Sequence, residues 1–331
     1  ALTGFAALGF ELYWTRALHH FLGNSTYAFS AMLTTYLTGL AAGSWVGGRL
    51  ADRTSSPART LGYVQAGLAL SVAATLPLIW NWLPGLDSSI INPSGWTAFL
   101  LRRFLLSFAV MALPTFLSGM TFPLVNRIGI QGLENLGGKV GHFYFANTAG
   151  SILGSLAAGF IILPLLGTRN ALLATSLLSA LVGLAILMKN SRRGSRDVWP
   201  GLAVVILLVV LFAPISRFAK PLLGDSQDPV DVVLFDREDP TAQTRVFRKP
   251  NGEMYMAVDG HHIGGTEKGI ARKEKILAHL PMVLSPGAHH TLSVGLGSGV
   301  TLGALSLYDE IEKMTCVEIV PGVMEGAHFF A

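Results

Sequence analysis

Residues 292–305 read LSVGLGSGVTLGAL: a short apolar run, three closely spaced glycines and a helix-like stretch. Gly295, Gly297 and Gly299 have the spacing G-x-G-x-G, whereas the dinucleotide fingerprint G-x-G-x-x-G would need glycine in place of Val300. Glycines let the backbone turn sharply and let a ligand lie against the main chain. A helix that begins there offers free N–H groups to a polar ligand. The stretch therefore predicts a strand, a ligand-binding turn and a helix.

A second strand, predicted at 314–320, carries an acid near its end, in the run CVEIVP. An acid at this place can hold both ribose hydroxyls of a nucleoside. A glycine turn with a strand-end acid is the layout of S-adenosylmethionine-type sites, and a tight turn without a ligand is the alternative. The residues we expect to bind the cofactor are Gly295, Gly297, Ser298, Gly299 and Glu318.

The surrounding sequence predicts the fold of this part. Alternating or apolar runs predict strands at 232–235, 243–248 and 253–260, and KPNGE (249–253) is typical of a hairpin turn between the last two. A helix at about 267–280, ended by Pro281, is followed by the order strand, helix, strand, helix. Such alternation indicates a parallel sheet covered by helices. We expect a small β-hairpin module at 223–265 and, at 266–331, the start of an α/β Rossmann-like domain of the S-adenosylmethionine-dependent transferase type.

The preceding residues, 1–222, have a different composition. The whole chain of 331 residues is 51% hydrophobic and only 13% charged, with a mean hydropathy of +0.50, whereas a soluble domain carries about 25% charged residues. A membrane-crossing helix needs about 20 apolar residues. Seven stretches qualify, so we expect an α-helical polytopic membrane domain with helices at roughly 1–22, 27–48, 61–82, 100–122, 142–164, 170–188 and 199–218. The segment 83–98 is expected to be a loop or a short interfacial helix.

Small residues recur at every fourth position of two of these helices. Such faces allow close approach of two helices in lipid, and we favour tight packing over a substrate path along them. The two faces are Gly39, Gly43 and Gly47, and Ala146, Gly150, Gly154 and Ala158.

Glu11 and Arg16 lie inside the first apolar stretch, where a charge is costly and indicates function. They are about 140° apart around a helix, so they are not placed to pair. We expect Glu11 either to contact a polar group of a neighbouring helix, such as Gln65 or Asn147, or to serve as a ligand or proton site.

Positive charge marks the cytoplasmic connections of membrane proteins. By this rule the N-terminus lies on the cytoplasmic side of the membrane, and seven crossings would place the residues after 218 on the outer side. An adenosylmethionine-type cofactor is cytosolic, however. We therefore expect a cytosolic soluble domain on a bacterial-type inner membrane, with region 83–122 re-entering or splitting into two passes. The basic connections hold Arg49, Arg53 and Arg59; Arg127 and Lys139; and Lys189, Arg192, Arg193 and Arg196.

Several stretches together resemble membrane-fused homologues of spermidine synthase, in the order of that family. They are ALGFELYWTRALHHFLGNSTYAFSAMLTTYLTGLAAGSWVGGRLADR, MTFPL, FYFANTAGSILGSLAAGFIILPLLG, AHLPMVLSP, VGLGSGVTLGAL and VEIVPGVMEGA. The resemblance implies transfer of an aminopropyl group from decarboxylated S-adenosylmethionine to an amine such as putrescine. It implies no metal, and it makes Asp259 and Gln243 candidate substrate-binding residues.

This sequence departs from the family in ways that bear on the reaction. Ser298 stands where soluble spermidine synthases have aspartate, and EKGIARKEK replaces their DE..YHE stretch. The catalytic aspartate of the family lies beyond the glycine turn and the ribose acid. Both ends of the chain look cut, so we expect a fragment that lacks the catalytic base and is inactive.

Two other functions stay open: a transporter or scaffold with a non-catalytic nucleoside-binding domain, and an S-adenosylmethionine-dependent methyltransferase. The partners that we expect are the lipid bilayer and a small-molecule amine, and a homodimer is left open. No basic patch with interleaved aromatics indicates nucleic acid. The histidine pairs lack the ligand set of a metal site.

Overall fold

A computed structural model describes residues 1–22, 25–79, 95–130, 135–190, 198–218 and 231–331. The chain forms two compact units, Ala1–Lys220 and Pro221–Ala331. The predicted boundary at residue 222, and the predicted loop or interfacial helix at 83–98 as far as residue 94, lie outside the described residues.

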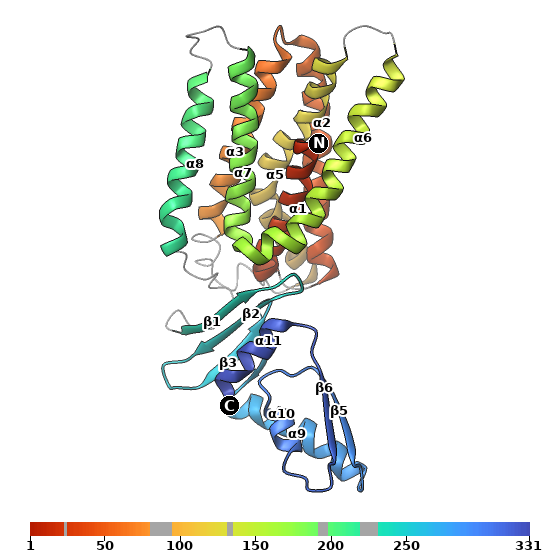
Figure 1. The fold of residues 1–331 in the computed structure, drawn as a ribbon, viewed down its shortest axis with the longest axis vertical. Coiled ribbons are helices and arrows are strands. Elements are labelled where there is room, and N and C mark those ends of the chain that lie inside the picture. The colour runs from red at the N-terminus through yellow and green to blue at the C-terminus, as the bar shows by residue number, and fades with distance from the viewer. Residues whose placement is uncertain (23–24, 80–94, 131–134, 191–197, 219–230) are drawn as a thin grey trace. The chain divides into compact units, whose positions relative to one another are not determined.

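The first unit is helical, and each of the seven stretches predicted to be an apolar helix is helical where the structure describes it (Figure 1). Ser25 caps the second helix, because its hydroxyl accepts the N–H of Ala28 at 3.2 Å. Pro57 begins the third helix, where a missing N–H costs nothing. The helices are α1 (Leu2–Leu22), α2 (Thr26–Arg53), α3 (Pro57–Pro77), α5 (Trp96–Gly129), α6 (Leu136–Ala157), α7 (Leu163–Asn190) and α8 (Trp199–Phe218).

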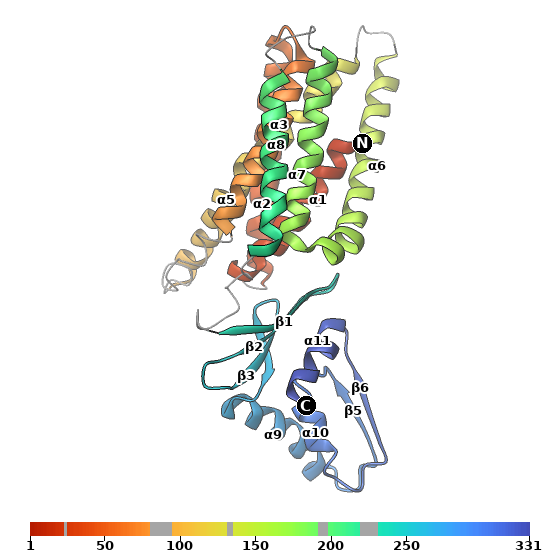
Figure 2. The same cartoon turned by 60° about the vertical axis from the view of Figure 1, so that its left-hand side comes forward.

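A π-helical turn, Ala158–Ile162, joins α6 to α7. The run Leu136–Asn190 is nevertheless not one straight helix, because Gly167 has φ 71° and ψ 165°, far from helical values. The chain reverses direction there, so that α6 and α7 form a helical hairpin (Figures 1 and 2).

Two helical runs among the described residues are long and apolar enough to cross a membrane, Trp96–Gly129 and Leu136–Asn190, and Trp199–Val210 is a shorter apolar helix. Glycine, threonine and tyrosine interrupt the hydrophobic sequence of α2, and charged residues interrupt that of α1. The expectation that 83–122 re-enters or splits is wrong for residues 96–122. These residues form a single helix, α5, although Pro114 lies inside it.

The two small-residue faces lie at close helix contacts. Gly39, Gly43 and Gly47 are buried against α5, and a Cβ added at Gly43 would collide with the carbonyl of Phe116. Gly150 and Gly154 of α6 meet the backbone of α1 in the same way. The favoured interpretation of these faces, tight helix packing, is confirmed at these glycines.

The second unit begins with a four-stranded antiparallel sheet in the order β1-β2-β3-β4. The hairpin turn predicted at 249–253 is confirmed, since Gly252 donates its N–H to the carbonyl of Lys249 at 2.9 Å. The third strand was predicted to extend to residue 260, but it ends at Val258. Asp259 and Gly260 have φ 47° and 79° and form a two-residue hairpin turn before β4. The strands are β1 (Val232–Glu238), β2 (Gln243–Arg248), β3 (Met254–Val258) and β4 (His261–Gly265).

A parallel βαβ unit follows the sheet. Strand β5 (His290–Val294) pairs in parallel with β6 (Lys313–Val317), and α10 (Val300–Leu305) connects them, as the alternating pattern predicts. Helix α9 (Lys268–Leu284) continues past Pro281, so the predicted end is wrong: Ser285 still donates to the carbonyl of Pro281 at 2.9 Å. The last helix, α11 (Pro321–Gly326), begins at its predicted proline, and a 3-10 turn, Ala327–Phe330, follows it.

Two small cores of the described residues attach the helices of this unit, and a third lies within the antiparallel sheet. Val320 and Val323, at the start of α11, pack with Ala242, Val246 and Met256 on the antiparallel sheet. Ala278 and Met282 of α9 pack with Ala304 and Leu305 of α10. One face of the parallel pair is apolar and exposed, and it comprises Leu292, Val294, Val317 and Ile319.

Candidate functional site

The glycine turn follows β5. Gly295, Gly297 and Gly299 have φ of 93°, 57° and 83°, a left-handed region that costs other residues about 1–2 kcal/mol. The N–H of Gly295 still pairs with the carbonyl of Val317 at 2.8 Å, so the turn begins where the parallel ladder ends. All three glycines are therefore required by the backbone, as the sequence predicts.

Glu318 lies just past the end of β6, beside this turn. One carboxylate oxygen accepts the N–H of Leu296 at 2.8 Å, and the other accepts those of Ile319 and Val320 at 2.8 and 2.9 Å. A carboxylate has about four lone-pair sites, so about one remains. The side chain thus fixes the turn and keeps capacity for about one further hydrogen bond, and its contact with ribose hydroxyls stays a prediction.

Ser298, at the centre of the turn, points toward α9. Its hydroxyl lies 2.9 Å from both carboxylate oxygens of Glu274, and both side chains are buried. Thr301 adds a bond from its hydroxyl to the carbonyl of Glu274 at 3.2 Å. Ser298 therefore links the turn to α9, and a contact from its hydroxyl to a cofactor stays a prediction.

A cleft of about 630 Å³ opens beside the turn. Its wall combines the edge of the parallel pair, the inner face of α9 and the end of the antiparallel sheet. Polar groups converge among apolar ones there, which is typical of small-molecule sites. The residues that bring polar groups to the cleft include Gly295, Gly297, Glu318, Glu274, Lys273 and His262.

The two predicted substrate-binding residues do not line this cleft. Asp259 accepts the N–H of Gln243 at 2.9 Å and donates its own N–H to the carbonyl of Gln243 at 2.9 Å. The amide of Gln243 is buried and donates to Asp236 at 2.7 Å. Both residues organise the sheet, and their contact with an amine stays a prediction.

Sequence reasoning missed three groups of the cleft. Glu274 lies in a run of charged residues on α9, yet it is buried, while its neighbour Lys273 is exposed. His262 stacks on Tyr255, with ring centroids 4.1 Å apart. The helical period places Glu274 and Ala278 on one face of α9, and that was the available signal.

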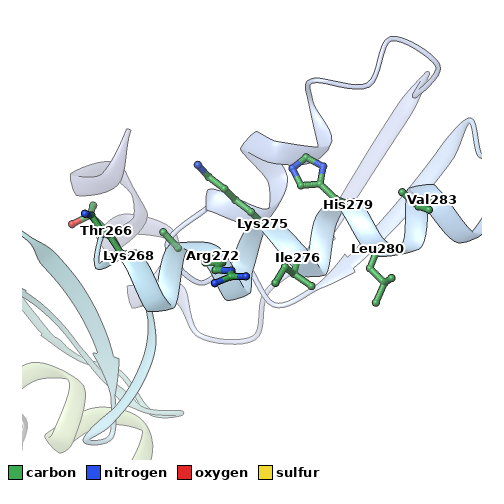
Figure 3. Close-up of a pocket in the computed structure, with 9 residues that line it drawn as sticks. Thr266, Lys268, Arg272, Lys275, Ile276, His279, Leu280 and Val283 are labelled. Atoms are coloured by element: carbon green, nitrogen blue, oxygen red, sulfur yellow. The ribbon is translucent and has the colours of Figure 1, made fainter.

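A second hollow of about 650 Å³ runs along α9. Apart from Thr266, its lining comes from that helix alone, and Ile276 and Leu280 point away from Lys275 and His279 (Figure 3). Groups from one helix do not converge on a ligand. We therefore assign the site to the cleft at the glycine turn.

One ion pair ties α9 to the antiparallel sheet. The ammonium of Lys249 lies 2.9 Å from the carboxylate of Glu267, and this hydrogen bond raises the pKa of Lys249. On the other side of the sheet, hydrogen bonds from Arg237 to Glu325 and Asp239 raise the pKa of the guanidinium. These pairs hold the elements that shape the cleft.

The chain therefore combines an apolar helical unit with a second unit that carries the cleft at the glycine turn. Part of this chain is similar to polyamine aminopropyltransferases. The enzyme of Thermotoga neapolitana is 30% identical over 95 residues, which are 29% of this chain and 32% of that protein. The enzyme of Yersinia pestis strain Pestoides F is 31% identical over 96 residues, again 29% and 32%. The chain thus spans about a third of the length of these relatives. No family model and no solved structure matches it.

Proposed function

We propose that the cleft binds the nucleoside of decarboxylated S-adenosylmethionine, and that the protein is a membrane-anchored aminopropyltransferase of the spermidine synthase type. The observation that carries this proposal is the cleft itself, where Gly295, Gly297 and Glu318 meet at the carboxyl ends of two parallel strands. The similarity to polyamine aminopropyltransferases supports the choice of cofactor and reaction.

The chemistry follows from the cleft. A nucleoside can lie against the glycine backbone without meeting a Cβ, and Glu318 has capacity for one ribose hydroxyl. The aminopropyl group would then move from the sulfonium to a neutral amine, with release of methylthioadenosine. This step needs a base for the amine's proton. Putrescine-like amines are the acceptors that the family resemblance implies.

A second function is favoured by one observation. The described carboxylates that line the cleft, Glu274 and Glu318, are both engaged, one by Ser298 and the other by three N–H groups. A cleft with these carboxylates alone would hold a nucleoside without turning it over. The alternative is therefore a membrane transporter or scaffold with a non-catalytic nucleoside-binding unit.

We further propose that the helical unit is embedded in the membrane and that the second unit is cytosolic, where the cofactor is found. Glycine contacts between α2 and α5 and between α1 and α6 support a membrane bundle, because such close approach is typical of helices in lipid.

The activity test uses membranes from cells that express the full-length gene, supplied with decarboxylated S-adenosylmethionine and putrescine. Release of methylthioadenosine that depends on putrescine would support the transferase. Binding of the nucleoside without release would favour the non-catalytic alternative. Absence of both would contradict the proposal.

A further inference from the structure

A cavity of about 240 Å³, with polar side chains among apolar ones, lies in the helical unit between α1, α2, α5 and α6. This is about the liquid volume of eight water molecules at roughly 30 Å³ each. Hydroxyl and amide side chains form much of its wall, among them Thr3, Tyr36, Ser44, Thr121 and Asn147. Polar groups among apolar helices are often functional, so this cavity is a candidate ligand site.

Four hydroxyl protons of the wall are committed, and the first is that of Thr3, which donates to the side-chain oxygen of Asn147 at 3.5 Å. Tyr36 donates to the carbonyl of Ala7 at 2.9 Å, and Ser44 donates to that of Gly119 at 3.1 Å. Thr121 donates to a carbonyl of its own helix at 3.5 Å. A hydroxyl has one proton and two lone pairs, so these groups have mainly acceptor capacity left. These four hydroxyls therefore suit the donors of a ligand.

A carboxylate lies one turn away. Thr3 and Ala7 of α1 line the cavity, and residues four apart lie on the same helix face, so Glu11 continues this face. The polar neighbours expected for it have other partners: Gln65 donates to Thr121, and Asn147 accepts from Thr3. Glu11 is half-buried and supplies negative charge next to a set of acceptors.

We propose that this cavity binds a small molecule carrying a protonated amino group, with Glu11 as its counter-charge. An ammonium has three donors and a positive charge, which complement the acceptors and the carboxylate. An anion would find no positively charged partner, since no described residue that lines the cavity is Lys or Arg. A lipid chain would leave the polar wall unpaired. This inference does not depend on nucleoside binding by the second unit.

The test measures equilibrium binding of radiolabelled 1,4-diaminobutane to the chain in lipid nanodiscs. We expect saturable binding that unlabelled diamine displaces and that 1,4-butanediol of the same length, Na⁺ or K⁺ does not. Hydrogen bonds to charged groups contribute about 1.5–3 kcal/mol, so Glu11→Gln should weaken binding about tenfold or more. The matched control is Ser176→Ala, because Ser176 is a fully buried hydroxyl of α7 that lies outside the cavity and bonds only Leu172.

Tyr36→Phe serves as a second variant if Glu11→Gln does not fold, since it keeps the ring and removes one acceptor. The proposal is overturned if no saturable diamine binding occurs, if the diol or K⁺ competes equally, or if both cavity variants bind like Ser176→Ala. Methylthioadenosine binding, measured on the same samples, reports on the second unit alone. Failure of the two proposals is therefore distinguishable.

Discussion

Glu318 accepts three backbone N–H groups, and Ser298 donates to the buried Glu274. The sequence predicts that these residues lie at the turn, because a strand-end acid and a glycine turn meet wherever two parallel strands pair. It does not predict how each side chain uses its hydrogen bonds. Those partners depend on α9, whose buried carboxylate looks in the sequence like one of several exposed charges.

Replacing Ser298 by Ala should destabilise the second unit by about 1–3 kcal/mol, because the buried carboxylate of Glu274 loses a donor. Faster amide hydrogen exchange across residues 290–305 would show this. Ser306→Ala is the control, since its exposed hydroxyl bonds only the carbonyl of Gly303, and should change stability by less than about 0.5 kcal/mol. Unchanged exchange with weaker nucleoside binding would mean that Ser298 contacts the ligand instead.

Replacing Glu318 by Gln should weaken nucleoside binding by about 1–3 kcal/mol, because a ribose hydroxyl loses a charged acceptor and the turn loses an N–H partner. The same change at Glu312, whose side chain is 69% exposed, should leave the affinity unchanged. Calorimetry with methylthioadenosine compares the two variants. Equal affinities would show that the ribose does not lie at Glu318.

At the scale of elements, the apolar stretches predict all seven helices because a run of about 20 apolar residues has few other structures open to it. Boundaries were less predictable. Gly167 breaks Leu136–Asn190 through its own backbone conformation, whereas Pro281 lies within α9 and does not end it. Strand β4 was missed because HHIGG has a single strong strand former, Ile263, and ends in two glycines, which are depleted in strands.

Two glycines of α2 allow a matched test of helix packing. A Cβ at Gly43 would collide with the backbone of Phe116 on α5, whereas one at Gly48 would meet nothing within 4 Å. Gly43→Ala should therefore destabilise the helical unit by about 1–3 kcal/mol through overpacking. Gly48→Ala should be neutral or slightly stabilising, because alanine favours the helix. Thermal unfolding in detergent distinguishes them, and equal melting temperatures would refute the close contact between α2 and α5.

At the scale of the whole molecule, two arguments bear on the side of the membrane that the second unit faces. Basic residues in alternate connections and a cytosolic cofactor point to opposite faces for the second unit. The re-entry that we expected to reconcile them is not seen, since α5 is one helix from Trp96 to Gly129. We keep the cytosolic placement as a proposal because the ligand requires it.

A cysteine at the exposed Asp309, with Cys316 replaced by Ser, should resist a membrane-impermeant thiol reagent in intact cells and react after permeabilisation. Gly137→Cys reports the side of the α5–α6 connection, because this position is exposed and a Cβ there meets nothing within 4 Å. Labelling of Asp309→Cys without permeabilisation would place the second unit outside and favour a non-catalytic function.

The central claim is that the cleft at the glycine turn binds a nucleoside, and calorimetry with methylthioadenosine tests it most directly. Gly295 and Gly252 have φ of 93° and 86°, and a Cβ at either meets nothing within 4 Å. Alanine at either position thus carries similar strain, about 1–2 kcal/mol, but only Gly295 lines the cleft. We predict that the parent chain and Gly252→Ala bind alike and that Gly295→Ala binds about fivefold to thirtyfold more weakly. No binding by the folded parent chain, or equal affinity in both variants, would contradict the account.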